Sequence, residues 1–358
     1  MNLPEYTQQI NNIIQAGGYT LGAQEKSSTL EDLLAFLDHH HSEGCMLYRN
    51  LHSNLSKSSR EIDQYIPARL FKEFNWTTEH PLLHGGKTFL SSGTSDSNRS
   101  QIFIDTETSN LQRQCFVSLF KSFIGSKRLP MLIINSKRSN LSDLDATRAG
   151  SAAFMLFSKK IFFANTENGE LNQESIQGFH AAADEGGGYV FGLTTSLYQY
   201  LRSLRQMKIG FKNKNNLTFI HGGGWKKMAD RGLSENDLKN DLQGTFDSYR
   251  LFEYYGLVEQ LGTIFFKCSE GFFHCSDLSD VSAFNRIGQK LETQEAGMLG
   301  ITSLLPLSYP GHRVLTEDSA TIVNSHGVVC KCGLESKKFI LHGRLPRAEV
   351  RGCANVAN

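Results

Sequence analysis

"NLTFIHGGGWKK", residues 216–227, joins a short apolar run to three consecutive glycines and a pair of lysines. The apolar run has the length and the aromatic and β-branched content of a buried strand. Glycines directly after a strand let a flat ring approach the backbone closely, although they also suit a plain turn into the next helix. Similar apolar runs occur at LPMLIIN (129–135), GGGYVFGL (186–193) and SYRLFEYYG (248–256).

The segments beside these runs carry helical patterns. One apolar stripe at helical spacing is made of Leu111, Cys115, Phe116, Leu119, Phe120 and Phe123. Short strands that alternate with amphipathic helices predict an α/β fold with a mostly parallel sheet covered by helices. In such a sheet, ligands bind where strands end and loops begin.

The first 60 residues have a helical pattern throughout. Ser28 and Glu31 form a capping-box motif that predicts a helix start just before LEDLLAFL. The triplet His39-His40-His41 ends this helix, and we interpret it as a solvated helix end rather than a metal site. One face of the first predicted helix is apolar, with Tyr6, Ile10, Ile13 and Ile14.

Helical patterns become rare after residue 260. LGTIFFKCSEGFFHC (261–275) and HRVLTEDSATIV (312–323) both have the pattern of β-hairpins, which predicts a smaller β-rich part. We therefore expect three regions: an N-terminal helical region at 1–85, an α/β nucleotide- and acyl-binding region at 86–260, and a β-rich region with an acceptor tail at 261–358.

Composition excludes several classes of function. Lys and Arg number 37 against 36 Asp and Glu, so bulk charge does not indicate binding to nucleic acid or to a membrane surface. No apolar run reaches the roughly 18 residues of a membrane span, and the N-terminus lacks a secretory signal. Seven cysteines without an export signal indicate reduced thiols and a cytoplasmic protein. The composition leaves oligomerisation open.

The stretch KTFLSSGTSDSNRSQIFID, residues 87–105, places a hydroxyl-rich turn between two strand-like runs. Backbone N–H groups around the glycine, together with these hydroxyls, can surround phosphate oxygens. Arg99 adds a bidentate cation, although a flexible surface loop would have a similar composition. The residues of this predicted phosphate loop are Ser91, Ser92, Gly93, Thr94 and Ser95.

Three other loops have chemistry that suits a nucleotide. In the loop Tyr254 to Gln260, a tyrosine can lie against a purine, and Glu259 can bind Mg²⁺ beside phosphates. An acidic residue at a strand end, here Asp318, can accept both ribose hydroxyls, and Arg344 can reach ribose or phosphate. The third loop holds the glycines that follow NLTFI. Each of these residues, taken alone, is more often an ordinary surface group.

The order of these motifs resembles the adenylate-forming superfamily of acyl-CoA synthetases. Several stretches are more similar still to the acyl-protein synthetases of the fatty acid reductase complex of luminous bacteria. The resemblance runs from about residue 60 to the end, and the stretches are IPARLFKEF (66–74), FLSSGTSDSNRS (89–100), HGGGWKK (221–227), YGLVEQLGTIFF (255–266), SYPGHRVLTED (308–318) and GRLPRAEVRGC (343–353).

The resemblance implies a fold, an activity and partners. Members of that family activate a fatty acid with ATP and Mg²⁺, hold it as a thioester on a cysteine, and pass it to a fatty acyl reductase that makes an aldehyde. By position, the resemblance assigns the triphosphate to Ser92, Gly93, Thr94 and Ser95, and the adenine to Gly223, Gly224 and Tyr255, with Gly256 as a further cofactor-binding residue. It assigns Mg²⁺ to Glu259, the ribose to Asp318 and Arg344, and the acyl group to Cys353.

Two features depart from the wider superfamily. The phosphate loop lacks the Gly-x-Pro-Lys that usually follows, so Arg99 must supply the charge. The sequence also lacks most of the usual small C-terminal domain, which carries a catalytic lysine. Lys226 or Lys227 could take its place, and a surface lysine pair is the alternative.

The cysteines suggest two further roles. Small neighbours and the nearby Arg347 and Arg351 suit Cys353 to thiolate chemistry, against the alternative of an inert terminal cysteine. A Cys-x5-His and a Cys-x-Cys, brought together, would give a four-ligand structural zinc site, against buried free thiols. Its ligands would be Cys268, His274, Cys330 and Cys332, with Cys275 as the alternative to the histidine.

Two other functions are compatible with these motifs. The adenylate could pass to coenzyme A or a carrier protein, as in ligases of the phenylacetate-CoA type, or the chain could be an inactive nucleotide-binding scaffold of a reductase complex. The length of the acyl chain is not readable. Phe154, Phe157, Phe191 and Leu193 could line an acyl tunnel, but core packing is the more frequent role of such residues.

Overall fold

The computed structural model describes residues 1–55, 60–90, 99–136, 152–184, 186–207, 216–225 and 232–345. The chain divides into two compact units. Among the described residues, the first unit comprises those up to Phe123 and those from Gly256 onward. The second unit comprises the described residues from Ile124 to Tyr255.

The first unit begins with three helices: α1 (Leu3–Ala16), α2 (Ala23–Gly44) and α3 (Met46–Leu55). The predicted apolar face of α1 is buried, and the hydroxyl of Tyr6 donates a 2.6 Å hydrogen bond to the Leu304 carbonyl. The predicted helix start at Ser28 is wrong, because α2 begins five residues earlier. The Ser28 hydroxyl instead donates back to carbonyls of the preceding turn, as a mid-helix serine does.

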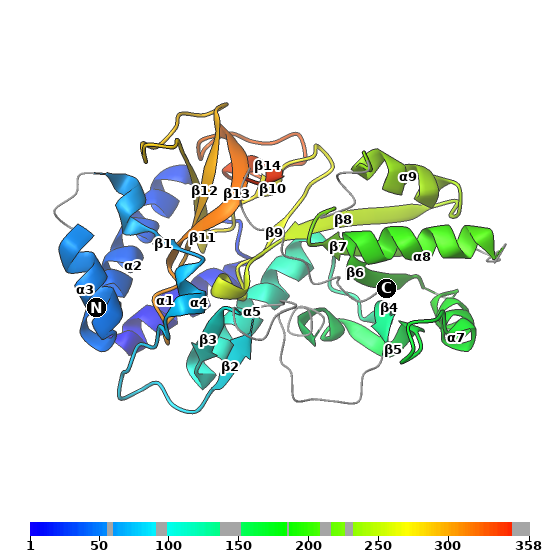
Figure 1. Cartoon of the computed structure of the whole chain (residues 1–358), viewed down its shortest axis with the longest axis horizontal. Coiled ribbons are helices and arrows are strands. Elements are labelled where there is room, and N and C mark those ends of the chain that lie inside the picture. The colour runs from blue at the N-terminus through cyan, green and yellow to red at the C-terminus, as the bar shows by residue number, and fades with distance from the viewer. Residues whose placement is uncertain are drawn as a thin grey trace. The chain divides into compact units, whose positions relative to one another are not determined.

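The sheet of the first unit has the strand order β10-β14-β13-β12-β11, antiparallel throughout, and β1 pairs with β13 in parallel. Figure 1 labels these strands, which are β1 (Ile66–Pro67), β10 (Phe273–His274), β11 (Ser279–Phe284), β12 (Ala296–Ser303), β13 (Arg313–Asn324) and β14 (Lys338–Arg344). This sheet confirms the predicted smaller β-rich part.

The hairpin predicted at 312–323 is wrong, since this stretch lies almost wholly within the single 12-residue strand β13. Its polar middle, which suggested a turn, is accommodated by register shifts against both neighbours. The stretch 261–275 does fold back on itself, because β9 (Phe265–Phe266) is followed by an antiparallel bridge between Lys267 and Phe273.

Shorter elements complete the first unit. They are η1 (Glu61–Gln64), α4 (Leu70–Glu73), the antiparallel pair β2 (Lys87–Leu90) and β3 (Gln101–Ile104), the long helix α5 (Thr106–Phe123), and the 3-10 turn η3 (Val258–Gln260). The apolar stripe predicted for a helix at 111–123 lies on α5, where most of it is buried.

The second unit contains five parallel strands in the order β5-β4-β6-β7-β8. The strands are β4 (Leu129–Ser136), β5 (Ser158–Asn165), β6 (Gly188–Leu193), β7 (Leu217–Gly222) and β8 (Tyr249–Tyr255). All four apolar runs predicted as strands appear here, and they confirm the helix-covered parallel sheet. No predicted strand covered β5.

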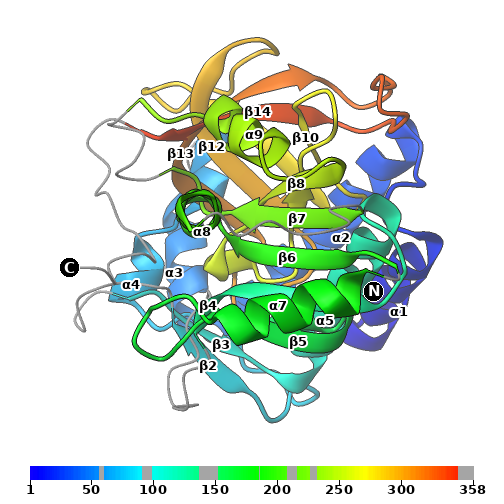
Figure 2. The same cartoon turned by 90° about the vertical axis from the view of Figure 1, so that its right-hand side faces the viewer.

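Three helices pack on one face of this sheet: α7 (Gln173–Ala183), α8 (Thr194–Gln206) and α9 (Glu235–Gln243). Figure 2 shows α7 lying over the strands, and α8 is seen there nearly end-on. One core cluster joins these helices to the strands, with Phe179, Leu201 and Phe219 fully buried. Among the described residues, no helix is both long and apolar enough to cross a bilayer.

Candidate active site

Glu259 lies in η3, three residues after Gly256, where the chain returns to the first unit. Its side chain is buried, and Oε1 accepts a 2.7 Å hydrogen bond from the Ser100 hydroxyl. Burial raises the pKa of the Glu259 carboxyl, while the Ser100 hydrogen bond and the positive charge of Arg344 act against that rise. A buried carboxylate with so few partners is suited to bind a cation.

The next residue fixes the turn that carries this carboxylate. The amide Nε2 of Gln260 donates to the Ile301 carbonyl at 3.1 Å and to the Gly311 carbonyl at 2.8 Å. Gln260 is itself buried, so both hydrogen bonds are shielded from water. The backbone at Glu259 is therefore anchored to strand β12 and to the segment before β13.

Arg99 lies beside Ser100, in the short segment that leads into β3. Its Nε is buried and donates no hydrogen bond to any group in the described part of the chain. A buried guanidinium N–H without an acceptor is costly, and an anion or a water molecule would satisfy it. The sequence singled out Arg99 as a phosphate ligand, and its unused donor is consistent with that role.

Asp318 and Arg344 face each other across the β13–β14 pair, where they are direct partners in the register. Arg344 Nε lies 3.5 Å from Asp318 Oδ1, and Arg344 Nη1 forms an ion pair with Glu317. The structure therefore brings together the two residues predicted to hold a ribose. Glu317 was not among the predicted site residues. Its acidic side chain directly before Asp318 is a signal that could have indicated it.

Glu259 lies within electrostatic range of the cross-strand residues Glu317 and Arg344. The charges of both Arg344 and Glu317 act on the Glu259 carboxyl. The first unit thus gathers a basic group, a buried carboxylate and an acid–base cross-strand pair. These are the residue types that bind phosphate, a divalent cation and a sugar.

The glycine-rich loop lies in the second unit, at the end of β7. Gly223 and Gly224 have positive φ angles of 82° and 62°, which favour glycine. A Cβ on Gly222 would lie 2.7 Å from the ring of Tyr254, so that position also requires glycine. Tyr255 and Gly256 follow at the end of β8, with Gly256 counted in the first unit.

Thr194, the first residue of α8, contacts the backbone just before this loop. Its hydroxyl donates to the Gly222 carbonyl at 3.1 Å and lies 3.0 Å from Nδ1 of His221. Because a hydroxyl has a single proton, His221 Nδ1 must be the donor in the second contact. The backbone that leads into the glycines is thereby held in one conformation.

Three aromatic rings lie behind the loop. The ring centroids of Phe154 and Phe191 are 4.4 Å apart, and that of Tyr254 lies 5.2 Å from Phe154. Phe154 and Phe191 are buried at 1% and 4% exposure, which favours the core interpretation over an acyl tunnel.

Several predicted site residues fall outside the described part of the chain. They are the phosphate-loop residues Ser91, Ser92, Gly93, Thr94 and Ser95, together with Lys226 and Cys353. Their predicted roles remain predictions.

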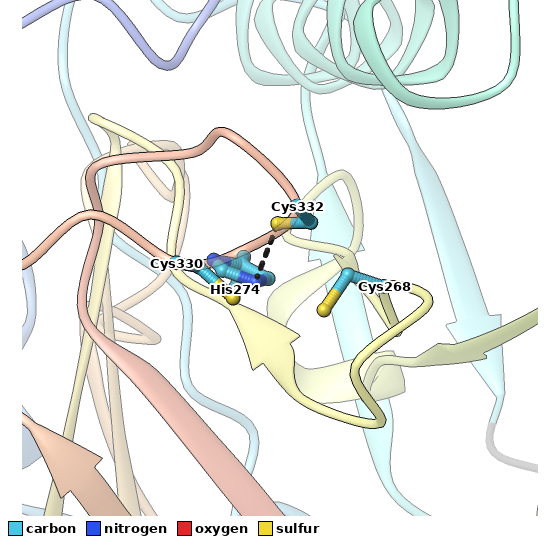
Figure 3. A group of neighbouring side chains, drawn as sticks. All are labelled: Cys268, His274, Cys330 and Cys332. Atoms are coloured by element: carbon cyan, nitrogen blue, oxygen red, sulfur yellow. Dashed lines mark hydrogen bonds between the residues drawn. The ribbon is translucent and has the colours of Figure 1, made fainter.

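Four predicted metal ligands do come together. Cys268, His274, Cys330 and Cys332 place their ligand atoms within 4.8 Å of one another, at the point where the β9–β10 turn meets the β13–β14 loop (Figure 3). His274 Nε2 lies 3.5 Å from Cys332 Sγ. Cys275 is fully buried elsewhere, so the histidine rather than this cysteine belongs to the cluster.

Tight turns present the cysteines of this cluster. The Gly271 amide donates to the Cys268 carbonyl at 3.0 Å, and the Gly333 amide donates to the Cys330 carbonyl at 2.8 Å. Both glycines have positive φ, at 84° and 94°. Burial lowers the pKa of His274 to about 4, so the imidazole is neutral, which is the form that binds metals.

The histidine triplet at the end of α2 differs from the expectation. Only His39 is exposed, whereas His40 and His41 are buried. His41 Nδ1 lies 2.7 Å from the Thr78 hydroxyl, and His40 Nε2 lies 2.9 Å from the Leu307 carbonyl. The solvated helix end was therefore wrong for two of the three residues, because segments distant in sequence cover this end of the helix.

Comparison with known proteins gives two positive findings. A family model described as "Acyl-protein synthetase, LuxE" matches residues 6–358. Among solved structures, an open conformation of 2-hydroxyisobutyryl-CoA ligase with 2-HIB-AMP and CoA matches with a TM-score of 0.65 and 13% identity, over 91% of this chain and 71% of that chain. The same ligase in the postadenylation state, with R3-HIB-AMP, gives a TM-score of 0.62 and 13% identity over 92% and 69%. A search of curated protein sequences gave no match. At this identity, the structures establish the fold, which is that of the adenylate-forming ligases.

Proposed function

The chain belongs to the LuxE family of acyl-protein synthetases, and from this premise we propose that it activates a fatty acid with ATP and captures the acyl group on Cys353. The thioester would then be delivered to a fatty acyl reductase that makes the aldehyde. The proposal rests above all on one contact, that of the buried Glu259 carboxylate with Ser100, beside the unused buried donor of Arg99.

Each residue of the site would have a distinct role in binding ATP. Arg99, with the hydroxyl-rich residues 91–95, would bind the triphosphate, and Glu259 would bind Mg²⁺. Asp318 and Arg344 would exchange their mutual contact for contacts with the ribose. Gly223, Gly224, Tyr255 and Gly256 would contact the adenine, and Lys226 would approach the reacting phosphate.

The first step makes an acyl-adenylate. The fatty acid carboxylate attacks the α-phosphorus, the bond to pyrophosphate breaks, and a mixed anhydride with AMP forms. The obstacle is the repulsion between two anions, which Arg99 would reduce on the protein side. Bound Mg²⁺ would supply further charge neutralisation at the phosphates.

The second step makes the thioester. The Cys353 thiol loses its proton, its thiolate attacks the acyl carbonyl, and the bond to AMP breaks. Arg347 and Arg351 lie close in sequence and would favour the thiolate over a thiol whose ordinary pKa is about 8.5. An acyl group held on a short tail with small neighbours could reach a partner's active site.

Isotope exchange tests the two steps separately. Wild-type protein should exchange labelled pyrophosphate into ATP only when a fatty acid is present, and should retain labelled acyl chains that hydroxylamine removes. Cys353→Ser should keep the exchange and lose the retained label, while the control Cys45→Ala should keep both. Label retained by Cys353→Ser would exclude this cysteine, and label that appears on added coenzyme A instead would indicate a CoA ligase. Absence of exchange across fatty acids of all lengths would indicate a scaffold.

We also propose that the Cys/His cluster binds a structural zinc ion. A tetrahedral site with Zn–S bonds of about 2.3 Å separates its ligand atoms by about 3.8 Å. The observed limit of 4.8 Å requires movements of about 1 Å at most. His274 Nδ1 lies 2.8 Å from the Ser336 hydroxyl, which leaves Nε2 for the metal.

Metal analysis tests the zinc proposal. Protein purified without added zinc should contain about one zinc per chain. Cys332→Ser should lose it, and Cys115→Ala, which removes a buried thiol outside the cluster, should retain it. Zinc at only trace levels in the wild type would show that the cluster holds free thiols.

A further inference from the structure

The contact between Ser100 and Glu259 links two segments that are 159 residues apart in sequence. Ser100 directly follows Arg99, and Glu259 lies in η3. Ser100 is fully buried, and Glu259 is 7% exposed. We propose that Ser100 is a positioning residue that orients the Glu259 carboxylate to bind the divalent cation of a metal–ATP complex. This inference rests on the proposed function, because that function assigns the cation to Glu259.

The hydrogen bond orients the carboxylate. Oε1 accepts from the Ser100 hydroxyl at 2.7 Å. The carboxylate also accepts from the backbone amide of Glu259 itself, and in the described part of the chain Ser100 is the one other residue that hydrogen-bonds it, so lone pairs are left for a cation. Metal-binding carboxylates are commonly oriented in this way by a neighbouring donor, and loss of such a donor typically costs about 10- to 100-fold in metal affinity or activity.

The backbone on both sides of the contact is fixed independently of it. Ser100 leads directly into β3, whose Ile102 and Ile104 are buried in the core of the first unit. On the other side, the two hydrogen bonds of the Gln260 side chain hold η3. The fold therefore does not depend on the Ser100 hydroxyl to keep these segments in place, and removal of the hydroxyl should free the carboxylate rather than unfold the site.

The same residue also relates the cation to the phosphates. Arg99 directly precedes Ser100 in sequence, so one short segment would carry a phosphate ligand and orient the metal ligand. A cation that bridges phosphate oxygens requires the phosphate ligand and the metal ligand to be held at a fixed separation. Ser100 follows Arg99 in the chain and donates a hydrogen bond to Glu259, so it would connect the phosphate ligand to the metal ligand.

The alternative is that the Ser100 hydroxyl only contributes to folding. A matched control exists in Ser308, which is fully buried and donates its hydroxyl to the Phe103 backbone carbonyl at 3.1 Å. Ser308→Ala removes a buried serine hydrogen bond that involves no proposed ligand. A folding role predicts the same consequences for both serines, whereas a positioning role predicts a change in metal dependence for Ser100 alone.

The experiment uses the full chain as wild type, Ser100→Ala, Ser100→Thr and Ser308→Ala. Pyrophosphate exchange is measured against free Mg²⁺, binding of Mn²⁺–ATP is measured directly by calorimetry, and thermal unfolding is recorded without nucleotide. We expect Ser100→Ala to raise the Mg²⁺ concentration for half-maximal exchange about 10-fold or more and to weaken Mn²⁺–ATP binding similarly. Its Tm should fall no further than that of Ser308→Ala. Ser100→Thr, which keeps the hydroxyl, should restore the metal dependence.

Unchanged metal dependence in Ser100→Ala, or an equal shift in Ser308→Ala, would overturn the inference. Should the alanine variant fail to fold, Ser100→Cys keeps the volume with a weaker donor and is expected to show the same shift, and wild-type metal dependence there would count against the inference. A wild-type protein that binds Mn²⁺–ATP but shows no pyrophosphate exchange would refute the proposed reaction. The Ser100 inference would then be decided by comparing Mn²⁺–ATP binding of wild type and Ser100→Ala. Failure to bind Mn²⁺–ATP at all would overturn both.

Discussion

Two carboxylates of the first unit, Asp38 and Glu259, have opposite surroundings. Asp38 Oδ1 accepts from the Tyr48 hydroxyl at 2.8 Å, lies 2.9 Å from His312 Nε2, and pairs with the Arg313 guanidinium. Burial alone would raise the pKa of Asp38, but the hydrogen bonds and charges of His312 and Arg313 hold it well below its usual range. Glu259 has the Ser100 hydroxyl, its own backbone amide and a more distant arginine, and burial leaves its pKa raised.

The difference separates a structural carboxylate from a functional one. The charge of Asp38 is compensated by residues of α3 and β13, so its contribution is to hold α2 against the sheet. The charge of Glu259 is compensated only in part, which costs stability in the absence of a ligand. A buried, undercompensated carboxylate beside other polar groups indicates a site where binding matters more than stability.

The largest expected effect is that of Glu259→Gln on activity. Pyrophosphate exchange should fall by about 100-fold or more, because the amide cannot supply a negative charge to a cation. The unfolding free energy at pH 7 should not decrease, because the substitution removes a buried charge and keeps an oxygen for Ser100. Exchange kinetics and urea unfolding measure the two quantities. Exposed Glu295→Gln is the control, and near-normal exchange by Glu259→Gln would place the cation elsewhere.

Asp38→Asn should show the reverse pattern. It leaves Arg313 partly buried without its counter-charge, and should lower the unfolding free energy at pH 7 by about 3 kcal/mol. Exchange per folded molecule should stay at the wild-type level. Because the folded-state pKa of Asp38 is depressed, the stability it contributes is present above its unfolded pKa of about 3.9 and is lost as the pH falls further.

Urea unfolding at pH 7 and at successive pH values below 4 checks this prediction. The difference between wild type and Asp38→Asn should narrow as the pH decreases. Glu61→Gln, in an exposed pair with Lys290, is the matched control and should cost less than about 1 kcal/mol. A stability difference that stayed constant down to pH 2 would mean that ionisation of Asp38 is not its source.

Features that depend on residues close together in sequence could be predicted, whereas features that depend on residues far apart in sequence could not. The apolar runs at 129–135 and 216–223 identified β4 and β7, because burial on both faces of a parallel sheet leaves a local pattern. The Cys/His cluster was also predictable, since two close pairs of ligand residues carry their own spacing signal. Glu259, Asp318 and Arg344 were proposed as site residues through their place in an ordered set of motifs, and Arg99 through the composition of its loop; these roles remain predictions.

What the sequence did not reveal depends on distant partners. His41 is buried because Thr78 and His312 cover it, 37 and 271 positions away, and nothing in the triplet itself indicates this. The stretch 312–323 suggested a hairpin, but β13 continues through its polar residues, with a register shift against β12 and pairing of Asp318 with Arg344 of β14. Ser100 was visible as one hydroxyl among many, and only the fold shows that it is the partner of Glu259.

Arg344 is intermediate between the two carboxylate environments, since it is half-exposed and shared between Glu317 and Asp318. Such an exposed pair contributes at most about 1 kcal/mol, so Glu317→Gln should change the unfolding free energy little. It should nevertheless tighten ATP binding by up to about five-fold, because it releases Arg344 and removes a negative charge near the proposed phosphate site. Asp318→Asn should instead weaken ATP binding, because a ribose acceptor is lost.

Calorimetric titration of ATP into the two variants tests this difference in sign. The effect of Glu317→Gln should diminish at high salt, as expected of a partly exposed charge, whereas that of Asp318→Asn should persist because it arises from a hydrogen bond. If both substitutions weakened ATP binding to the same degree, Glu317 and the nucleotide would not be competing for Arg344. The charge compensation seen at Arg344 would then be structural, as it is at Asp38.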